Sequence, residues 1–371
     1  MKFICSKTEL LASVSTASRA AAQKSPVPAL EGLLLEAFED KVKISGYDLK
    51  TGITTVFPAD VKEQGSIVLN SRLFGEIIRR LPDDEVTIRA DESLMTHISC
   101  LMSEFEILGM SPVDYPELPA VDTQHTLRVE AAKLRSMIGQ TNFAVSFDES
   151  RPIHTGSLFE VENGILTVVA VDGFRLALRR EQISDSSDAC SFVVPGAALS
   201  EVEKILGDGD EEVTVSQGDK HIMFVIGGTV LISRRLEGEF LNYKNSIPRD
   251  GKYVIEADRR SLVESVERVS LIISEKLKSP IRCTFEDGVL KMLSYTAIGK
   301  ASDECSVSGD GEGLEIGFNN RYLSEALKAA PADTVKLLLT SSVSPCVIIP
   351  SDGSDNFLYM ILPVRLKAYE G

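Results

Sequence analysis

The chain has 371 residues, and at roughly 100–200 residues per domain this length favours two or three domains over one. Hydrophobic residues make up 43% and charged residues 25%, which argues against disordered, collagen-like and coiled-coil chains. The net charge of −16 counts against a generally basic nucleic-acid-binding protein, although a local basic face on an acidic body stays open.

The scattered cysteines indicate a protein of a reducing compartment, and the lack of long apolar runs gives no sign of a membrane protein. No two cysteines form a Cys-x-x-Cys pair, so we expect buried, reduced thiols and no zinc site. The first five residues hold no apolar core of signal-peptide length, and no run of about 18 apolar residues predicts a membrane span. We therefore expect a cytoplasmic protein. The cysteines are Cys5, Cys100, Cys190, Cys283, Cys305 and Cys346.

A short apolar strand followed by an amphipathic helix is predicted three times along the chain. The helices are indicated by apolar residues that recur at three- and four-residue spacing. The copies comprise 2–4 with 8–14, 127–129 with 132–138, and 253–255 with 260–266.

A β-hairpin is predicted after each of these helices. Asn163-Gly164 and Asp287-Gly288 are strong turn signals, and Glu39-Asp40 takes the same place in the first copy. The hairpins span 33–44, 157–169 and 281–293, and they end in matched triplets that begin at Tyr47, Val171 and Tyr295. Successive triplets begin 124 residues apart, at positions 47, 171 and 295.

A strand, a helix and a second strand complete each copy. Equal spacing of three separate landmarks indicates a threefold internal repeat. We therefore predict an α+β chain of three repeated domains, each with two helices and antiparallel sheets, with limits at 1–122, 123–250 and 251–371. The third elements comprise 67–70, 73–81 and 85–88; 192–195, 199–206 and 212–215; and 316–319, 323–330 and 334–337.

Motifs for catalysis and for metal or cofactor binding are missing. The chain has no phosphate-binding loop, no dinucleotide fingerprint and no nucleophile elbow, and its four histidines are isolated. Acidic, glycine-containing stretches at 207–210, 308–311 and 352–355 match no calcium loop and are interpreted as solvated turns. We expect no catalytic residues, metal or cofactor. An enzyme site built from Asp148, Glu149, Arg151 and Asp172 remains an alternative.

Segments that differ among the copies carry a family resemblance. The second copy continues as Asp172-Gly173-Phe174-Arg175-Leu176-Ala177, and the chain end contains Leu362-Pro363-Val364-Arg365-Leu366. Together with Met1-Lys2-Phe3, Leu10-Leu11, Arg151-Pro152-Ile153 and 155–160, they make the whole chain resemble the beta subunit of bacterial DNA polymerase III, the DNA sliding clamp family.

This resemblance implies a ring. Two chains of three domains would form a head-to-tail homodimer of six clamp domains around duplex DNA, with helices lining the hole and sheets outside. The ring would catalyse no reaction, and it would bind DNA without sequence preference. It would provide processivity by tethering the polymerase III alpha subunit, the clamp-loader complex and other clamp-motif proteins. A repeat scaffold that binds proteins without encircling DNA is the second alternative.

The resemblance also implies a peptide-binding site between the second and third domains. An extended peptide with apolar anchors would dock there, and Arg175 and Arg365 would either orient it or brace the site. The corresponding residues are His154, Thr155, Val171, Gly173, Phe174, Arg175, Leu176, Leu241, Asn245, Ser246, Met360, Ile361, Leu362, Pro363, Val364 and Arg365.

Three of these positions depart from the forms common in the family. His154 stands where leucine is frequent, Leu241 where proline is frequent, and Asn245 where arginine is frequent. These departures bear on the peptide preference. His154 is either a group that titrates near neutral pH or a structural histidine.

Basic residues on the predicted helices are candidates for phosphate contacts inside the ring. Lys24 and Arg72 fall where the family places basic DNA contacts and therefore rank highest. For each candidate, a solvated helix charge is about as good an interpretation as a DNA contact. The second helix of the middle copy is poorer in basic residues and carries Glu201 and Glu203. The remaining candidates are Arg19, Arg79, Lys133, Arg135 and Lys276.

Overall fold

The computed structural model describes residues 1–183, 185–186, 189–209, 211–248, 250–274, 276–309, 311 and 313–366. Asp210 and Asp310 of the acidic stretches lie outside these residues. The chain divides into two compact units: Met1–Leu134 with Ser184–Ser187 and Ser200–Arg235, and Arg135–Ile183 with Asp188–Leu199 and Leu236–Gly371. Each unit is described by itself.

The first unit contains two antiparallel sheets. One has the order β5 (Asp60–Glu63), β1 (Lys2–Ser6), β7 (Glu85–Ala90), β8 (Met95–Cys100) and β9 (Ser103–Leu108). The other has the order β14 (Asp185–Ser186), β10 (His125–Glu130), β16 (Glu212–Gln217), β17 (His221–Ile226), β18 (Thr229–Arg234), β4 (Thr51–Pro58), β3 (Lys41–Tyr47), β2 (Gly32–Phe38) and β6 (Gly65–Asn70). The second sheet therefore runs from strands of the middle repeat into strands of the first.

The second unit contains one long antiparallel sheet that joins the middle and third repeats. Its order is β15 (Cys190–Pro195), β11 (Gly156–Glu162), β12 (Ile165–Val171), β13 (Arg175–Gln182), β26 (Phe357–Ile361), β25 (Cys346–Pro350), β24 (Thr334–Leu339), β19 (Tyr253–Asp258), β22 (Gly299–Gly309), β21 (Val289–Thr296), β20 (Ile281–Glu286) and β23 (Glu315–Phe318).

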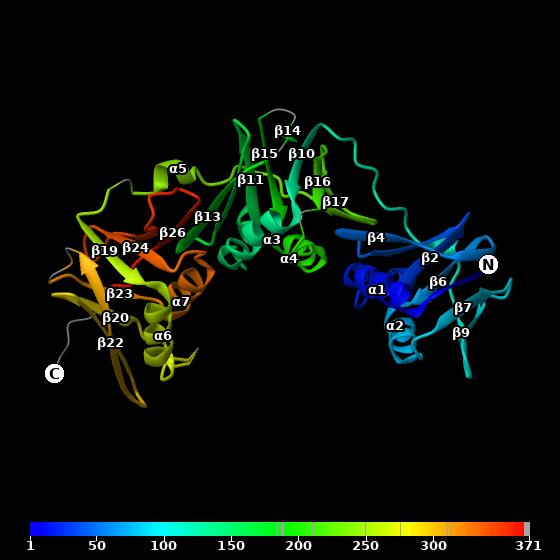
Figure 1. Ribbon diagram of the computed structural model, residues 1–371, viewed down its shortest axis with the longest axis horizontal. Helices are drawn as coiled ribbons and strands as arrows, with labels where there is room; N and C mark the ends of the chain where they lie inside the picture. The colour runs from blue at the N-terminus through cyan, green and yellow to red at the C-terminus, as the bar shows by residue number, and fades with distance from the viewer. Residues whose placement is uncertain are drawn as a thin grey trace. The chain divides into compact units, whose positions relative to one another are not determined.

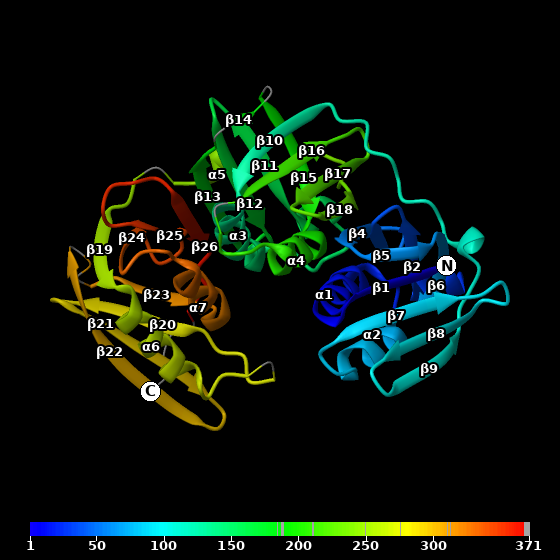
Figure 2. The same cartoon turned by 45° about the vertical axis from the view of Figure 1, so that its right-hand side comes forward.

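The helices come in pairs. Figure 1 and Figure 2 both show α1 beside α2 and α6 beside α7, each pair next to strands of its own repeat. Asparagine or aspartate side chains cap several of them: Asn70 accepts from the Leu73 amide, and Asp258 accepts from the Ser261 amide. The helices are α1 (Lys7–Ala17), α2 (Ser71–Arg80), α3 (Ala131–Gly139), α4 (Gly196–Ile205), α5 (Tyr243–Ser246), α6 (Arg259–Ser270) and α7 (Asn320–Ala329).

The predicted repeats are confirmed element by element. Each copy has its strand–helix, hairpin and strand–helix–strand segments at the predicted places, and Asn163 and Gly164 adopt the positive φ values that their turn requires. The four-residue helix α5 was not predicted. The two compact units are divided inside α3 and α4, which are not the predicted limits between the three domains. Those limits therefore remain a prediction.

Apolar burial explains why the helices and sheets pack together. In the first repeat, Leu10 and Val14 of α1 and Phe74 and Ile78 of α2 are fully buried with residues of both sheets. In the third repeat, Leu262 and Leu327 are buried in the same way. Five cysteines are buried and Cys190 is partly buried, and all six carry free thiols, as predicted.

Candidate binding sites

Strand pairing in the second unit joins two segments that are far apart in the sequence. β13 pairs with β26 from Arg175 opposite Ile361 to Arg179 opposite Phe357, and Leu176 lies directly opposite Met360. The two strands lie side by side in Figure 1. This pairing brings the two predicted halves of the peptide-binding site together.

An apolar patch covers this strand junction. Its buried part includes Val171, Leu176 and Met360, which belong to one cluster with Tyr243 of α5. Its exposed part consists of Phe174, Leu241 and Val364, whose exposed fractions are 59%, 42% and 36%. We call Val171, Phe174, Leu176, Leu241, Met360, Ile361, Leu362 and Val364 the apolar patch. Exposed apolar side chains over a buried apolar base are typical of a docking surface.

The turn between β12 and β13 holds Phe174 outward. The Asp172 carboxylate accepts hydrogen bonds from the amides of Phe174 (2.9 Å) and Arg175 (3.0 Å), and the Leu362 amide donates to the Phe174 carbonyl (2.8 Å). Gly173 has φ +90°, a left-handed conformation that favours glycine, and a Cβ there would meet nothing within 4 Å. The turn therefore presents an aromatic ring beside open space.

Arg175 lies beneath the patch and braces it. Its guanidinium donates to Asp172 (2.9 Å), to Glu325 of α7 and to the Phe143 carbonyl (2.6 Å), and the side chain is only 3% exposed. It also lies over the Tyr322 ring, 4.5 Å from the centroid. Since these contacts tie β13 to α7, the bracing role is favoured over direct peptide contact.

Arg365 and Val364 face different surroundings. Val364 lines a pocket with Tyr322, whereas Arg365 lines another pocket, of about 680 Å³, with Lys252 and Val343. Arg365 is exposed. The structure therefore does not place the Arg365 side chain in the same pocket as its neighbour.

His154 and Thr155 form one edge of the site. The His154 ring meets Phe240 edge to face, with centroids 5.6 Å apart. Partial burial, followed by the nearby Arg151 charge, lowers the pKa of His154, so the ring is neutral at neutral pH. Thr155 donates its hydroxyl to the Pro152 carbonyl (2.7 Å). These contacts favour the structural interpretation of His154.

Asn245 and Ser246 lie on the short helix α5. Both are exposed, and the Ser246 hydroxyl donates to the Asn242 carbonyl (3.1 Å). The Tyr243 hydroxyl donates to the Glu160 carboxylate of β11 (2.6 Å), which anchors the helix beside the patch. This bond depends on the folded arrangement and has no signal in the sequence.

Several candidate DNA contacts are already paired with carboxylates. Arg19 pairs with Glu201 (3.4 Å), Arg79 pairs with Glu76, and Lys133 pairs with Glu130 (2.8 Å). Arg135 is half-buried on α3. Lys24, Arg72 and Lys276 are exposed and form no ion pair within the described part of the chain.

Arg19, Arg72 and Arg79 meet at one pocket of the first repeat. The pocket, of about 880 Å³, lies where α1 and α2 face each other. Of these three side chains, Arg72 is the one without an ion pair in the described residues. Lys24 and Arg72, ranked highest from the sequence, therefore also keep the charge that a phosphate would meet.

Comparison with known proteins assigns all three repeats. The DNA polymerase III beta subunit models for the N-terminal, central and C-terminal domains match residues 1–119, 128–242 and 244–365. The chain belongs to the DNA polymerase III beta-subunit family. The family consists of the beta sliding clamps of bacterial DNA replication, which are processivity factors and not enzymes.

Individual relatives of this sliding-clamp family agree along the full chain. The beta sliding clamp of Halalkalibacterium halodurans is 33% identical over 379 residues, covering 98% of this chain and 100% of the relative. The beta sliding clamp of Staphylococcus aureus is 30% identical, covering 98% and 99%. The crystal structure of a putative DNA polymerase III beta subunit from Eubacterium rectale has a TM-score of 0.93 at 32% identity, covering 99% of this chain and 100% of that one. The Bacillus subtilis DNA polymerase sliding clamp has a TM-score of 0.94 at 29% identity, with the same coverage.

Two residues of the enzyme alternative, Asp148 and Asp172, have other contacts in this clamp fold. Asp148 accepts from the Ser150 amide (2.9 Å) on an exposed loop, and this bonding lowers its pKa. Asp172 is bound to Arg175. No cluster of histidine, cysteine and carboxylate side chains that could hold a metal ion occurs among the described residues. No helix in the described residues is long and apolar enough to cross a membrane.

Sequence reasoning missed the aromatic and acidic residues that support the patch. Tyr322 stacks on Phe174 with ring centroids 6.2 Å apart, and Glu325 binds Arg175. Phe143 contacts Arg175, and Phe240 contacts His154. Nothing in the sequence identifies them, because they lie far from Arg175 or His154 in the chain and meet them only in the folded structure.

Proposed function

We propose that two copies of this chain close head to tail into a six-domain ring that encircles duplex DNA, slides along it and tethers the replicative polymerase. The ring acts in the bacterial cytoplasm, where replication takes place. It catalyses no reaction. Its effect is to raise the effective concentration of the polymerase at the template.

The unpaired strand edges support closure into a ring. Within the chain, β18 pairs with β4 and β26 pairs with β13, so each junction joins the last strand of one repeat to the strand that follows the hairpin of the preceding repeat. β9 is the matching last strand of the first repeat, and β22 is the matching strand after the hairpin of the third. The free edge of β9 and the 299–306 edge of β22 have no strand partner among the described residues. Pairing β9 of one copy with β22 of the other removes both exposed edges.

The internal repeats also give the register of this pairing. Thr51, Arg175 and Gly299 occupy equivalent positions, and the first two pair with Ser233 and Ile361. Met110, Leu236 and Val364 form equivalent isolated bridges just after β9, β18 and β26. These bridges therefore align the three last strands residue by residue. Extending the register places Ile107 opposite Gly299 of the other copy and Glu106 opposite Lys300. The Glu106 and Lys300 side chains carry opposite charges, which favours this register.

The charge distribution supports loose contact with DNA. Lys24 and Arg72 of the first repeat and Lys276 of the third offer charges without carboxylate partners in the described residues, on a chain of net charge −16. Contacts to phosphates carry no sequence information, and a small number of them leaves the ring free to slide.

The apolar patch is the proposed dock for the partners. An extended segment with apolar anchors would lie on Leu176, Met360 and the exposed Phe174. The polymerase III alpha subunit, the clamp-loader complex and other clamp-motif proteins would bind there in turn. Val171, Gly173, Leu241 and Val364 would shape the contact.

The ring is tested by native mass and by retention on DNA. We expect a native mass of twice the 40.4 kDa chain, and retention on closed circular DNA that is lost when the circle is cut. Glu106→Lys and Lys300→Glu should each weaken the dimer, and the double variant should restore it. A monomeric protein that is not retained on circles would support the scaffold alternative instead.

Peptide docking is tested by fluorescence polarisation of a labelled Gln-Leu-Ser-Leu-Phe peptide. We expect saturable binding that falls roughly tenfold in Phe174→Ala, since this exposed ring can be removed without disturbing the core. Leu49→Ala, at the corresponding exposed turn of the first repeat, is the matched control and should bind normally. Binding that is equal in all three proteins would place the dock elsewhere.

A further inference from the structure

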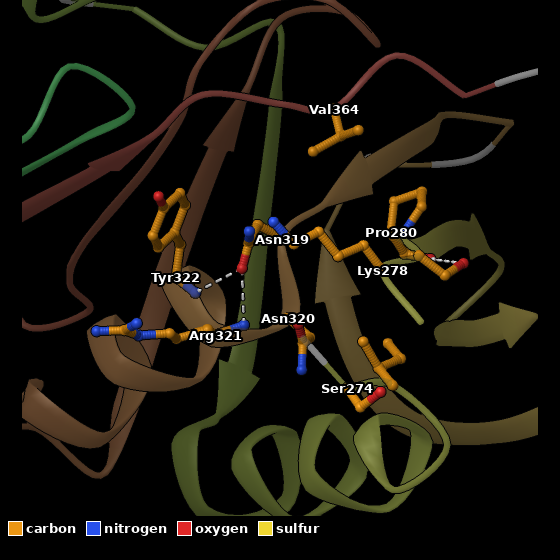
Figure 3. Close-up of a pocket in the computed structure, with 10 residues that line it drawn as sticks. Ser274, Lys278, Pro280, Asn319, Asn320, Arg321, Tyr322 and Val364 are labelled. Atoms are coloured by element: carbon orange, nitrogen blue, oxygen red, sulfur yellow. Dashed lines mark hydrogen bonds between the residues drawn. The ribbon is translucent and has the colours of Figure 1, made fainter. Parts of the chain in front are cut away.

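A pocket of about 940 Å³ opens next to the apolar patch. It lies between the segment that follows α6 and the beginning of α7 (Figure 3). Its lining includes Ser274, Lys278, Asn319, Arg321, Tyr322 and Val364.

The charge of this pocket is unusual for the molecule. Its described lining holds two cations and no carboxylate, although the chain has 55 acidic residues against 39 basic ones. Four other pockets each include at least one carboxylate, such as Glu76, Asp303, Glu315 and Glu267. Cations without a carboxylate among the described lining residues provide charge complementarity for an anionic group.

Lys278 is the cation that faces the pocket. Figure 3 shows its side chain reaching across the pocket toward Asn319, while the Arg321 side chain points away. Arg321 donates to Glu325 (2.9 Å), whereas Lys278 is exposed and forms no ion pair within the described residues. Asn319 already accepts from the Arg321 and Tyr322 amides (3.0 and 3.3 Å), so the lysine rather than the helix end is available to an anion.

The pocket is continuous with the apolar patch. Val364 belongs to both, and Tyr322 lines the pocket while stacking on Phe174 of the patch. A peptide whose apolar anchors lie on the patch therefore brings its flanking residues to Lys278. We infer that this pocket binds an acidic side chain next to the apolar anchors of a partner peptide, and that Lys278 recognises it. This inference rests on the proposed peptide docking.

The test compares labelled peptides that differ only in the flank. Gln-Leu-Ser-Leu-Phe is extended by two aspartates before or after the motif, and each peptide is matched with one carrying two asparagines. At low ionic strength we expect one acidic peptide to bind about threefold more tightly than its asparagine counterpart, the range of a single partly exposed ion pair. Lys278→Gln should abolish this gain. Lys276→Gln removes the same charge from the same segment but not from the pocket lining, and should keep it.

The outcomes separate this inference from the proposed function. If the asparagine peptides bind but neither acidic flank improves affinity, the inference is wrong and peptide docking stands. If no peptide binds the intact protein, the docking proposal itself fails. If Lys278→Gln weakens binding of a short single-stranded oligonucleotide and leaves every peptide unchanged, the pocket serves phosphate and the inference is overturned. Matching thermal melts of both lysine variants would exclude misfolding.

Discussion

The two internal strand junctions share one topology but differ in what covers them. At the β18–β4 junction, Leu118 packs so closely on Gly52 that a Cβ there would lie 2.8 Å from the leucine side chain. Tyr115 is buried nearby and donates to the Ser45 carbonyl (3.2 Å). At the β13–β26 junction, the position equivalent to Gly52 is Leu176, and the neighbouring Phe174, Leu241 and Val364 are exposed.

This difference shows how one repeat gives both a closed and an open surface. In the first junction the chain supplies its own apolar residue, Leu118, against the strand. In the second junction the corresponding area stays available for an apolar residue of another protein. The first junction is also held by hydroxyl groups, such as Thr229 donating to Thr55 (3.2 Å), whereas the second is held by the buried Arg175. In the proposed docking, an apolar residue of a partner takes the place of this missing internal contact.

The largest expected effect comes from removing the Arg175 brace. Arg175→Met leaves Asp172 and Glu325 facing each other without the guanidinium, and we expect a loss of about 3 kcal/mol in the free energy of unfolding. Urea denaturation measures this loss. Thr51→Val at the equivalent place of the first junction is the control, with an expected change of about 0.5 kcal/mol. Equal stability of both variants would refute the bracing role.

A smaller effect is expected from opening the first junction. Leu118→Ala removes a partly buried side chain from the cluster with Tyr47 and Tyr115, at a cost of about 2 kcal/mol. It should also expose an apolar surface that binds a hydrophobic fluorescent dye. Leu101→Ala, at a residue 66% exposed, should change neither the melting temperature nor dye binding. Unchanged dye fluorescence in Leu118→Ala would mean that the first junction does not open.

The smallest effect concerns pH at the edge of the apolar patch. Burial and Arg151 lower the pKa of His154, so the ring in the folded protein is neutral at neutral pH and becomes charged only as the pH falls below the ordinary histidine range. We therefore expect constant peptide affinity from mildly alkaline pH down to about 6.5, with weakening only below it. Polarisation titrations across this range check the sign. His154→Gln should remove the acid-side weakening, and a transition above neutrality in the parent would contradict the assigned direction.

Local structure was largely predictable from the sequence because local patterns determine it. Asn163-Gly164 specifies its turn, and the apolar spacing of 260–266 marks a helix that the structure places at Arg259–Ser270. The threefold repeat then assigns most strands without knowledge of their partners. The short helix α5 was missed because its anchor is the distant carboxylate of Glu160.

The roles of single charged side chains were not predictable, because they depend on segments far apart in the chain. Arg175 and Glu325 are 150 residues apart, and Arg19 and Glu201 are 182 apart. The sequence identified the residues of the apolar patch through a family resemblance, but it did not distinguish a bracing arginine from a contacting one. Nor did it show which cations are already neutralised.

The continuous sheets across repeat limits have a consequence for how the chain can be divided. The strands of the middle repeat belong half to the first compact unit and half to the second, so this repeat shares each of its sheets with a neighbour. A protease cut or gene split at a repeat limit would leave a bare edge such as β26, the strand that contains Phe357 and Tyr359. Separately expressed repeats should therefore self-associate or aggregate. In hydrogen exchange, protection should follow the sheets rather than the repeats.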